Sequence, residues 1–176
     1  LIWFLRQVEG PGDPDLMIKY GSPGDFPVVG DWDRDGVSEI GVVRGNRWLL
    51  RNRNSSGSAD IDLTFSGWQQ GDIPIAGDWD GDGRTGIGYA RVQGGTVRWL
   101  LRDSLSSGGA QYDFTFGPGG SGHPVIGDWD GDGRAGVGWF SGGNWQIRNS
   151  LSSGSADSAF FFGNSSGIPV TWTRLA

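Results

Sequence analysis

Short stretches in which apolar and polar residues alternate recur along the chain, and glycine, serine and asparagine separate them. In one stretch Ile61, Leu63 and Phe65 alternate with Asp62 and Thr64, and this period of two residues predicts a strand with one buried face. No stretch shows the period of 3.6 residues that indicates a helix, and the high glycine content would disfavour one. The pattern therefore predicts an all-β fold of short strands joined by turns.

Four landmarks recur in a constant order: a proline followed by Val or Ile, an aspartate-rich loop, a Trp-x-(Leu/Ile)-Arg segment and an aromatic alternation. Each unit of four landmarks predicts four strands, and four short strands per roughly 45 residues are typical of a propeller blade. The predicted repeats are 27–73, 74–123 and 124–168, with partial units at 1–26 and 169–176.

The sequence thus predicts one domain, 1–176, that forms a β-propeller of about four four-stranded blades. The chain begins at the third strand of a unit, because Trp3 matches Trp48, and a first strand is expected after Pro169. Pairing of these two partial units would complete a fourth blade and remove the free edges. Two alternatives remain open: the chain is part of a larger propeller, or two copies associate into one.

Aspartates stand at alternate positions of the loop in each of the three complete units. Such residues converge in a tight turn, and Ca²⁺ takes roughly six to eight oxygen ligands. A simpler reading is that these are ordinary turns in which aspartate bonds the backbone. Positions 1, 3 and 5 carry aspartate, position 7 would add a backbone carbonyl, and only the first loop has a carboxylate at position 9. The candidate ligands are Asp31, Asp33, Asp35, Val37 and Glu39; Asp78, Asp80, Asp82 and Arg84; and Asp128, Asp130, Asp132 and Arg134.

This arrangement resembles the FG-GAP or VCBS-type repeat, D-x-D-x-D-G-x-x-D followed by an apolar strand, which builds the propellers of integrin α-chains. The resemblance implies calcium in the loops and a secreted or cell-surface binding module. Glu39 replaces the final aspartate of the motif, and Gly86 and Gly136 leave the other two loops without it.

Composition narrows the function classes. The absence of cysteine excludes disulfides and thiolate chemistry, and His123 as the single histidine removes most triads and imidazole metal sites. A net charge of −6 argues against a nucleic-acid groove, and no apolar run is long enough to predict a membrane span. No pair of acids is marked for glycoside hydrolysis, so an enzyme is not expected.

Two groups of tryptophans outside the aspartate loops carry different expectations. Those of the Trp-x-(Leu/Ile)-Arg segments are expected in the core between blades, with the arginine pairing with a neighbouring blade or stacking on tryptophan. Trp68, Trp139 and Trp172 fall off the repeated positions and are the candidates for surface contact with a ligand. The predicted function is a calcium-stabilised extracellular adhesion module that binds a protein or glycan. The alternatives are a carbohydrate-binding lectin and a structural, self-assembling protein, and a homo-oligomer stays open.

Overall fold

The computed structural model describes residues 1–6, 10–164 and 166–171, and these residues form no helix. Their strands form three four-stranded sheets and one two-stranded sheet, all antiparallel, which confirms the all-β class. The strands are β1 (Ile2–Leu5), β2 (Leu16–Lys19), β3 (Phe26–Gly30), β4 (Glu39–Arg44), β5 (Arg47–Leu50), β6 (Ile61–Thr64), β7 (Ile73–Gly77), β8 (Gly86–Gln93), β9 (Thr96–Arg102), β10 (Tyr112–Thr115), β11 (His123–Gly127), β12 (Gly136–Ser141), β13 (Asn144–Arg148) and β14 (Ser158–Phe161).

Each four-stranded sheet is a run of consecutive strands: β3 to β6, β7 to β10 and β11 to β14. The pairing register is the same in all three, so residues can be compared from sheet to sheet. Trp48 lies opposite Leu63, Trp99 opposite Phe114 and Trp145 opposite Phe160, so the third-strand tryptophan has the same cross-strand position in each sheet. In the two-stranded sheet Trp3 lies opposite Ile18, so β1 and β2 correspond to the third and fourth strands of the larger sheets.

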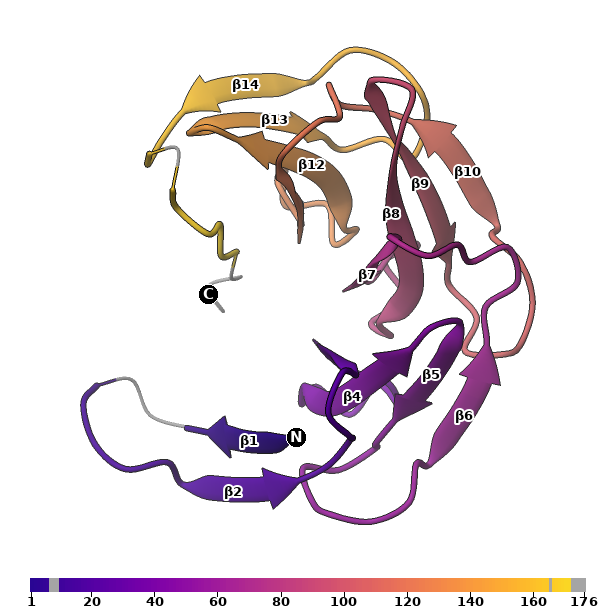
Figure 1. The fold of residues 1–176 in the computed structure, drawn as a ribbon, viewed down its shortest axis with the longest axis vertical. Helices are drawn as coiled ribbons and strands as arrows, with labels where there is room; N and C mark the ends of the chain where they lie inside the picture. Colours follow the sequence, from indigo (N-terminus) through magenta and orange to yellow (C-terminus); the bar gives the residue numbers. More distant parts are fainter. Residues whose placement is uncertain (7–9, 165, 172–176) are drawn as a thin grey trace.

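The four sheets follow one another around an arc (Figure 1), with β3, β7 and β11 inside and β6, β10 and β14 outside. The inner strands β3, β7 and β11 contact each other in that order. An opening separates β14 from β1 and β2, and the last described residues run into it (Figure 1). The strand expected after Pro169 is not formed in the described residues 169–171, while 172–176 lie outside them. Closure of the ring by the two partial units therefore stays a prediction.

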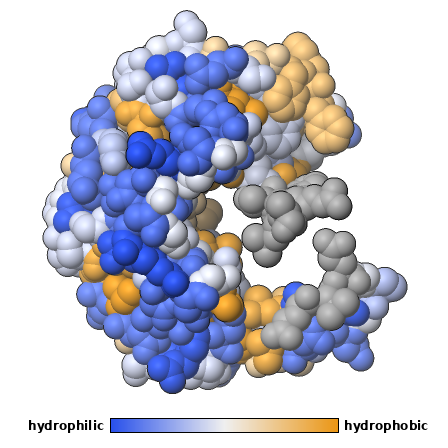
Figure 2. All heavy atoms as spheres, turned by 180° about the vertical axis from the view of Figure 1, so that it is seen from behind, coloured by the Kyte–Doolittle hydropathy of each residue, from blue (hydrophilic) through white to orange (hydrophobic). Residues whose placement is uncertain are grey.

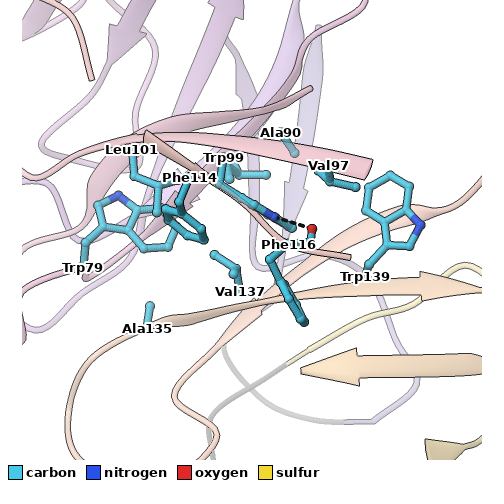
Figure 3. Close-up of a cluster of buried hydrophobic side chains, with 11 residues drawn as sticks. Trp79, Ala90, Val97, Trp99, Leu101, Phe114, Phe116, Ala135, Val137 and Trp139 are labelled. Atoms are coloured by element: carbon cyan, nitrogen blue, oxygen red, sulfur yellow. Dashed lines mark hydrogen bonds between the residues drawn. The ribbon is translucent and has the colours of Figure 1, made fainter. Parts of the chain in front are cut away.

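Each sheet has two faces. We call the face that carries the tryptophan of the third strand the tryptophan face, and the opposite one the reverse face. The tryptophan face of each of the first three sheets packs on the reverse face of the sheet that follows. Between the second and third four-stranded sheets, for example, Trp99 lies beside Val137 and donates its indole N–H to the Phe116 carbonyl, 2.9 Å away (Figure 3). Trp48 and Trp99 are buried between two sheets, and half-buried Trp3 packs against the first four-stranded sheet, so for these three the expected place between sheets is confirmed. Trp145 is buried only among residues of its own sheet, with no sheet packed over it in the described residues.

The predicted pairing of the segment arginines with a neighbouring sheet is wrong for Arg51, Arg102 and Arg148, as far as the described residues show. Each of these three reaches into the serine-rich loop that follows its own strand. The Nε atoms of Arg51, Arg102 and Arg148 donate to the carbonyl oxygens of Ser55, Ser106 and Ser152, at 3.2, 3.1 and 2.6 Å. The guanidinium thereby satisfies backbone carbonyls that no strand pairs, and it holds the loop in one shape.

The loop fixed in this way caps the outer strand of the preceding sheet. Gly108 donates its N–H to the Thr64 carbonyl at 3.1 Å and accepts from the Ser66 N–H at 2.7 Å. The hydroxyl of Ser153 accepts from the Thr115 N–H at 3.1 Å in the next pair of sheets. Successive sheets are therefore joined at the rim as well as through their faces.

Candidate metal centres

The first aspartate of each loop shapes the loop. The Asp31 carboxylate accepts the backbone N–H groups of Arg34, Asp35 and Gly36, at 2.7, 3.2 and 2.8 Å. Asp78 and Asp128 accept from the residues three, four and five positions later in the same manner. The ordinary turn chemistry of aspartate is thus present at position 1 of every loop.

The loops also gather carboxylate oxygens. In each of three groups, one oxygen from every side chain lies within 4.8 Å of the others. Calcium–oxygen distances are roughly 2.3–2.6 Å, so oxygens this close can all reach a single ion placed between them. The groups are Asp31, Asp33 and Glu39; Asp78, Asp80 and Asp82; and Asp128, Asp130 and Asp132.

Two predicted ligand positions are used differently. Asp35 is outside the group of the first loop, and its carboxylate accepts the Val37 N–H at 2.8 Å. At position 7 of the other loops, the backbone N–H groups of Arg84 and Arg134 likewise donate to the position-5 aspartate, both at 2.8 Å. A ligand role for the carbonyls of Val37, Arg84 and Arg134 stays a prediction.

Glu39 is the buried member of the first group. Its residue is 2% exposed, and one carboxylate oxygen accepts the Trp32 N–H at 3.4 Å. Burial, together with the smaller effect of the Asp35, Asp33 and Asp31 charges, raises the pKa of Glu39 to about 7, although the hydrogen bond from Trp32 acts in the opposite direction. Among the described residues no lysine or arginine forms an ion pair with this carboxylate. A cation bound in the first loop would therefore supply the positive partner that the Glu39 carboxylate lacks among the described side chains.

The loops of successive sheets are tied together. The Asp31 carbonyl accepts the Thr85 N–H at 2.7 Å, the Asp31 N–H donates to the Thr85 hydroxyl at 2.9 Å, and the Asp78 carbonyl accepts the Ala135 N–H at 2.6 Å. Arg34 of the first loop also forms an ion pair with the carboxylate of Asp82 in the second. The repeat pattern of the sequence did not predict these hydrogen bonds and this ion pair between loops.

Arg34 occupies a position where the other two loops carry glycine. Its φ is 69°, and Gly81 and Gly131 adopt φ values of 75° and 80° at the same place. This left-handed conformation disfavours residues that carry a Cβ atom. The departure from glycine was the sequence signal that could have marked Arg34 as a special residue.

Glycine at position 9 of the second and third loops has a steric cause. A Cβ atom on Gly86 would lie 2.6 Å from both the Trp79 ring and the Arg102 carbonyl oxygen. On Gly136 it would lie 2.6 Å from the Arg148 carbonyl oxygen and 2.8 Å from the Trp129 ring. No side chain, and so no fourth carboxylate, fits at either place while the backbone keeps this packing.

The three tryptophans singled out for ligand contact have different outcomes. Trp68 is partly exposed and lies beside the turn at Gly45. Trp139 is only 1% exposed because it packs between two sheets with Val97 (Figure 3), so its predicted surface role is wrong. Trp172 lies outside the described residues.

Comparisons of the chain with protein-family models, with curated proteins and with solved structures return no match. Within the described part of the chain there is no helix with the length and apolar character needed to cross a membrane.

Proposed function

We propose that this chain is a calcium-stabilised β-propeller module of FG-GAP-like repeats. The observation that carries the proposal is the clustering of three carboxylates in each of three loops, together with the burial of Glu39 among them without a cationic partner. Carboxylate oxygens in this number and spacing are ligands that suit a hard divalent cation.

The arrangement of the sheets supports the propeller part of the proposal. Four sheets follow an arc, and the three four-stranded ones have their first strands inside and their fourth strands outside (Figure 1). Each of the first three sheets packs face to face on the next. In a complete propeller the arc would close into a ring, and the opening between β14 and the sheet of β1 and β2 is where that closure has to be made (Figure 1).

The role proposed for calcium is structural. Each loop joins the first two strands of a sheet, and the backbone of Asp31 and Asp78 is bonded to the following sheet. An ion in the loop would therefore stiffen a sheet and its junction together. The turn reading explains the aspartates at positions 1 and 5. It also accounts for Asp80 and Asp130 at position 3, which accept the position-5 N–H at 3.2 and 3.3 Å, but it does not require the buried Glu39.

Thermal unfolding with calcium and with a chelator tests the metal. A site that is saturated at about 100 times its Kd adds about 2.7 kcal/mol of stability, so a rise in Tm that saturates with calcium is expected. Isothermal titration calorimetry then counts the sites. Asp33→Asn and Asp80→Asn should each remove one site, whereas Asp113→Asn, at an exposed pair with Arg98 outside the loops, should leave the calcium response unchanged. Superimposable unfolding curves with and without calcium would refute the proposal.

The biological role proposed is binding, as a secreted or cell-surface module that recognises an extracellular protein or glycan. It rests on the resemblance of the repeats to adhesion propellers, because fold alone does not select a function. A glycan array and an extracellular-protein array, probed with the calcium-loaded chain, separate the two ligand classes. Absence of signal on both would count against this role and leave the calcium sites untouched.

A further inference from the structure

The tryptophan face of the last sheet is uncovered, although its residues match those of the covered faces. Phe162 follows β14, and its backbone carbonyl accepts the Trp145 indole N–H at 2.9 Å. The Phe116 carbonyl accepts the Trp99 indole N–H at the same distance. Phe116 is 4% exposed beneath the following sheet, whereas Phe162 is 73% exposed. The last of the described sheets thus presents an apolar face of the kind that elsewhere binds another sheet.

This face forms an open groove of about 530 Å³. Trp145 and Phe160 stack in it with ring centroids 5.9 Å apart, and Trp129 and Phe162 also line it. Val170 and Thr171 reach one part of the groove, where the Thr171 hydroxyl donates to the Ile126 carbonyl at 2.7 Å. These contacts leave most of the outer half uncovered, as the exposure of Phe162 shows.

The other connections of a sheet junction are also missing here. The Asp31 and Asp78 carbonyls accept an N–H from the next sheet, but Asp128 forms no such bond among the described residues. A serine-rich loop caps β6 and β10, yet no loop in the described ranges caps β14. The face, the inner loop and the outer edge therefore lack the same partner, which is a following sheet.

The opposite end of the array presents the complementary surface. On the reverse face of β1 and β2, Ile2, Phe4 and Met17 are exposed, Phe4 by 61%. At the places of Ile2 and Met17, the first four-stranded sheet carries the ion pair Arg47–Asp62. Figure 2 shows hydrophobic surface on both sides of the opening in the arc. This sheet is thus more apolar on its reverse face than the sheet that already has a neighbour there.

The two-stranded sheet also carries the cap that β14 lacks. Arg6 donates to the carbonyls of Pro11 and Asp13, at 3.0 and 3.2 Å, as the other segment arginines bind their loops. Gly12 in this loop has a φ of 145°, close to the 157° of Gly108, which caps β6. The sheet of β1 and β2 therefore has a face and a loop that match the missing partner.

We propose that the tryptophan face of β11 to β14 binds the reverse face of β1 and β2 of a second copy of this chain, head to tail. Phe162 and Phe160 would be covered as Phe116 and Phe114 are covered within the chain. Each copy carries both surfaces, so two copies close into a ring where the rotation allows, and otherwise longer assemblies form. This association does not depend on the proposed calcium sites.

The test is the mass of the chain in solution, measured by light scattering and sedimentation over a wide concentration range, with calcium and with chelator. We expect a dimer or larger multiple under both conditions. Phe162→Ser on one surface and Phe4→Ser on the other should each weaken association by at least about tenfold, because truncating a buried aromatic anchor commonly costs more than that factor. Phe161→Ser is the matched control, since Phe161 is exposed on the opposite side of the same strand.

Mixing the two variants distinguishes head-to-tail binding from self-pairing of one surface. The Phe162→Ser chain keeps its Phe4 surface and the Phe4→Ser chain keeps its Phe162 surface, so an equal mixture should gain a mass that neither has alone. Because all three phenylalanines are exposed, circular dichroism should show folded variants. The proposal would be overturned by a monomeric wild-type chain, by equal effects of all three variants, or by a mixture that gains no mass. Each of these results would also be expected if the open face binds a different protein instead.

Discussion

Tyr89 offers a direct test of how the first two four-stranded sheets are joined. Its side chain is fully buried; the hydroxyl accepts the Trp48 indole N–H at 2.9 Å and donates to the Gly45 carbonyl at 2.8 Å. Tyr89→Phe keeps the ring but removes both hydrogen bonds. The Trp48 indole N–H is buried, and leaving it unmatched costs about 1–3 kcal/mol, whereas Gly45 is exposed, so its carbonyl can bond water instead. At about 2–4 °C per kcal/mol for a chain of this size, Tm should fall by roughly 2–12 °C.

Tyr20→Phe is the matched control. The Tyr20 hydroxyl is buried and has no hydrogen-bond partner among the described residues, and Phe65 and Phe116 occupy the corresponding places in the next two sheets. Removing this hydroxyl should leave stability unchanged or raise it slightly, because no bond is lost. Urea unfolding followed by tryptophan fluorescence measures both variants. Equal losses for the two substitutions, or no loss for Tyr89→Phe, would refute the reasoning.

Three further predictions concern charged residues. Arg34→Gly should strengthen calcium binding about two- to fivefold in calorimetry, because it frees the paired aspartate of the second loop from an ion pair of modest strength; unchanged affinity would contradict this. Arg91→Ala leaves the buried Asp72 carboxylate without its ion-pair partner and should lower the free energy of unfolding by about 3–5 kcal/mol in urea. Arg98→Ala, at an exposed ion pair, is the control and should cost about 0–1 kcal/mol. Similar losses for both variants would contradict this prediction. A hydrogen bond from the Arg44 guanidinium lowers the pKa of Asp25 below 3.8, its ordinary value in the unfolded chain. The Asp25 carboxylate therefore stabilises the fold at pH values above 3.8, and this stabilisation is lost as the pH falls through the lower pKa of the folded state. Asp25→Asn should therefore flatten the acid side of the stability curve, and an unchanged curve would count against the assignment.

The strands and their faces could be predicted because each is encoded locally. Alternation assigns a face to every side chain, and the tryptophan of the third strand recurs at one place in the register. The predicted surface role of Trp139 was wrong because other repeats carry no tryptophan at this position, although the position itself recurs in each sheet. It lies opposite Pro124 as Tyr89 lies opposite Pro74, and Tyr89 is fully buried. Its pairing with a repeated proline was the available signal.

The contacts of the segment arginines could not be predicted from the pattern. Most of their bonds go to backbone carbonyls of loop residues such as Ser55 and Ser106, and a carbonyl has no residue identity to recognise. Their other partners include the hydroxyls of the same serines and, for Arg51, the Asp60 carboxylate at 2.9 Å. In the first loop, the grouping of Glu39 rather than Asp35 with the other carboxylates depends on side-chain direction in a turn. The sequence supplied the acids, and the tertiary structure decided which of them converge.

Position 9 shows how packing and metal chemistry compete in these loops. The indoles of Trp79 and Trp129 leave no room for a Cβ atom on the glycine that opens the next strand, so these loops keep three carboxylates. In the first loop a carboxylate stands at that position. Burial raises its pKa, and among the described residues no lysine or arginine forms an ion pair with it. Burying an uncompensated carboxylate opposes folding, and evolution of a purely structural turn would favour glycine there as in the other loops. A bound cation removes that penalty, and this is the physical reason why the first loop, of the three, bears most directly on the calcium proposal.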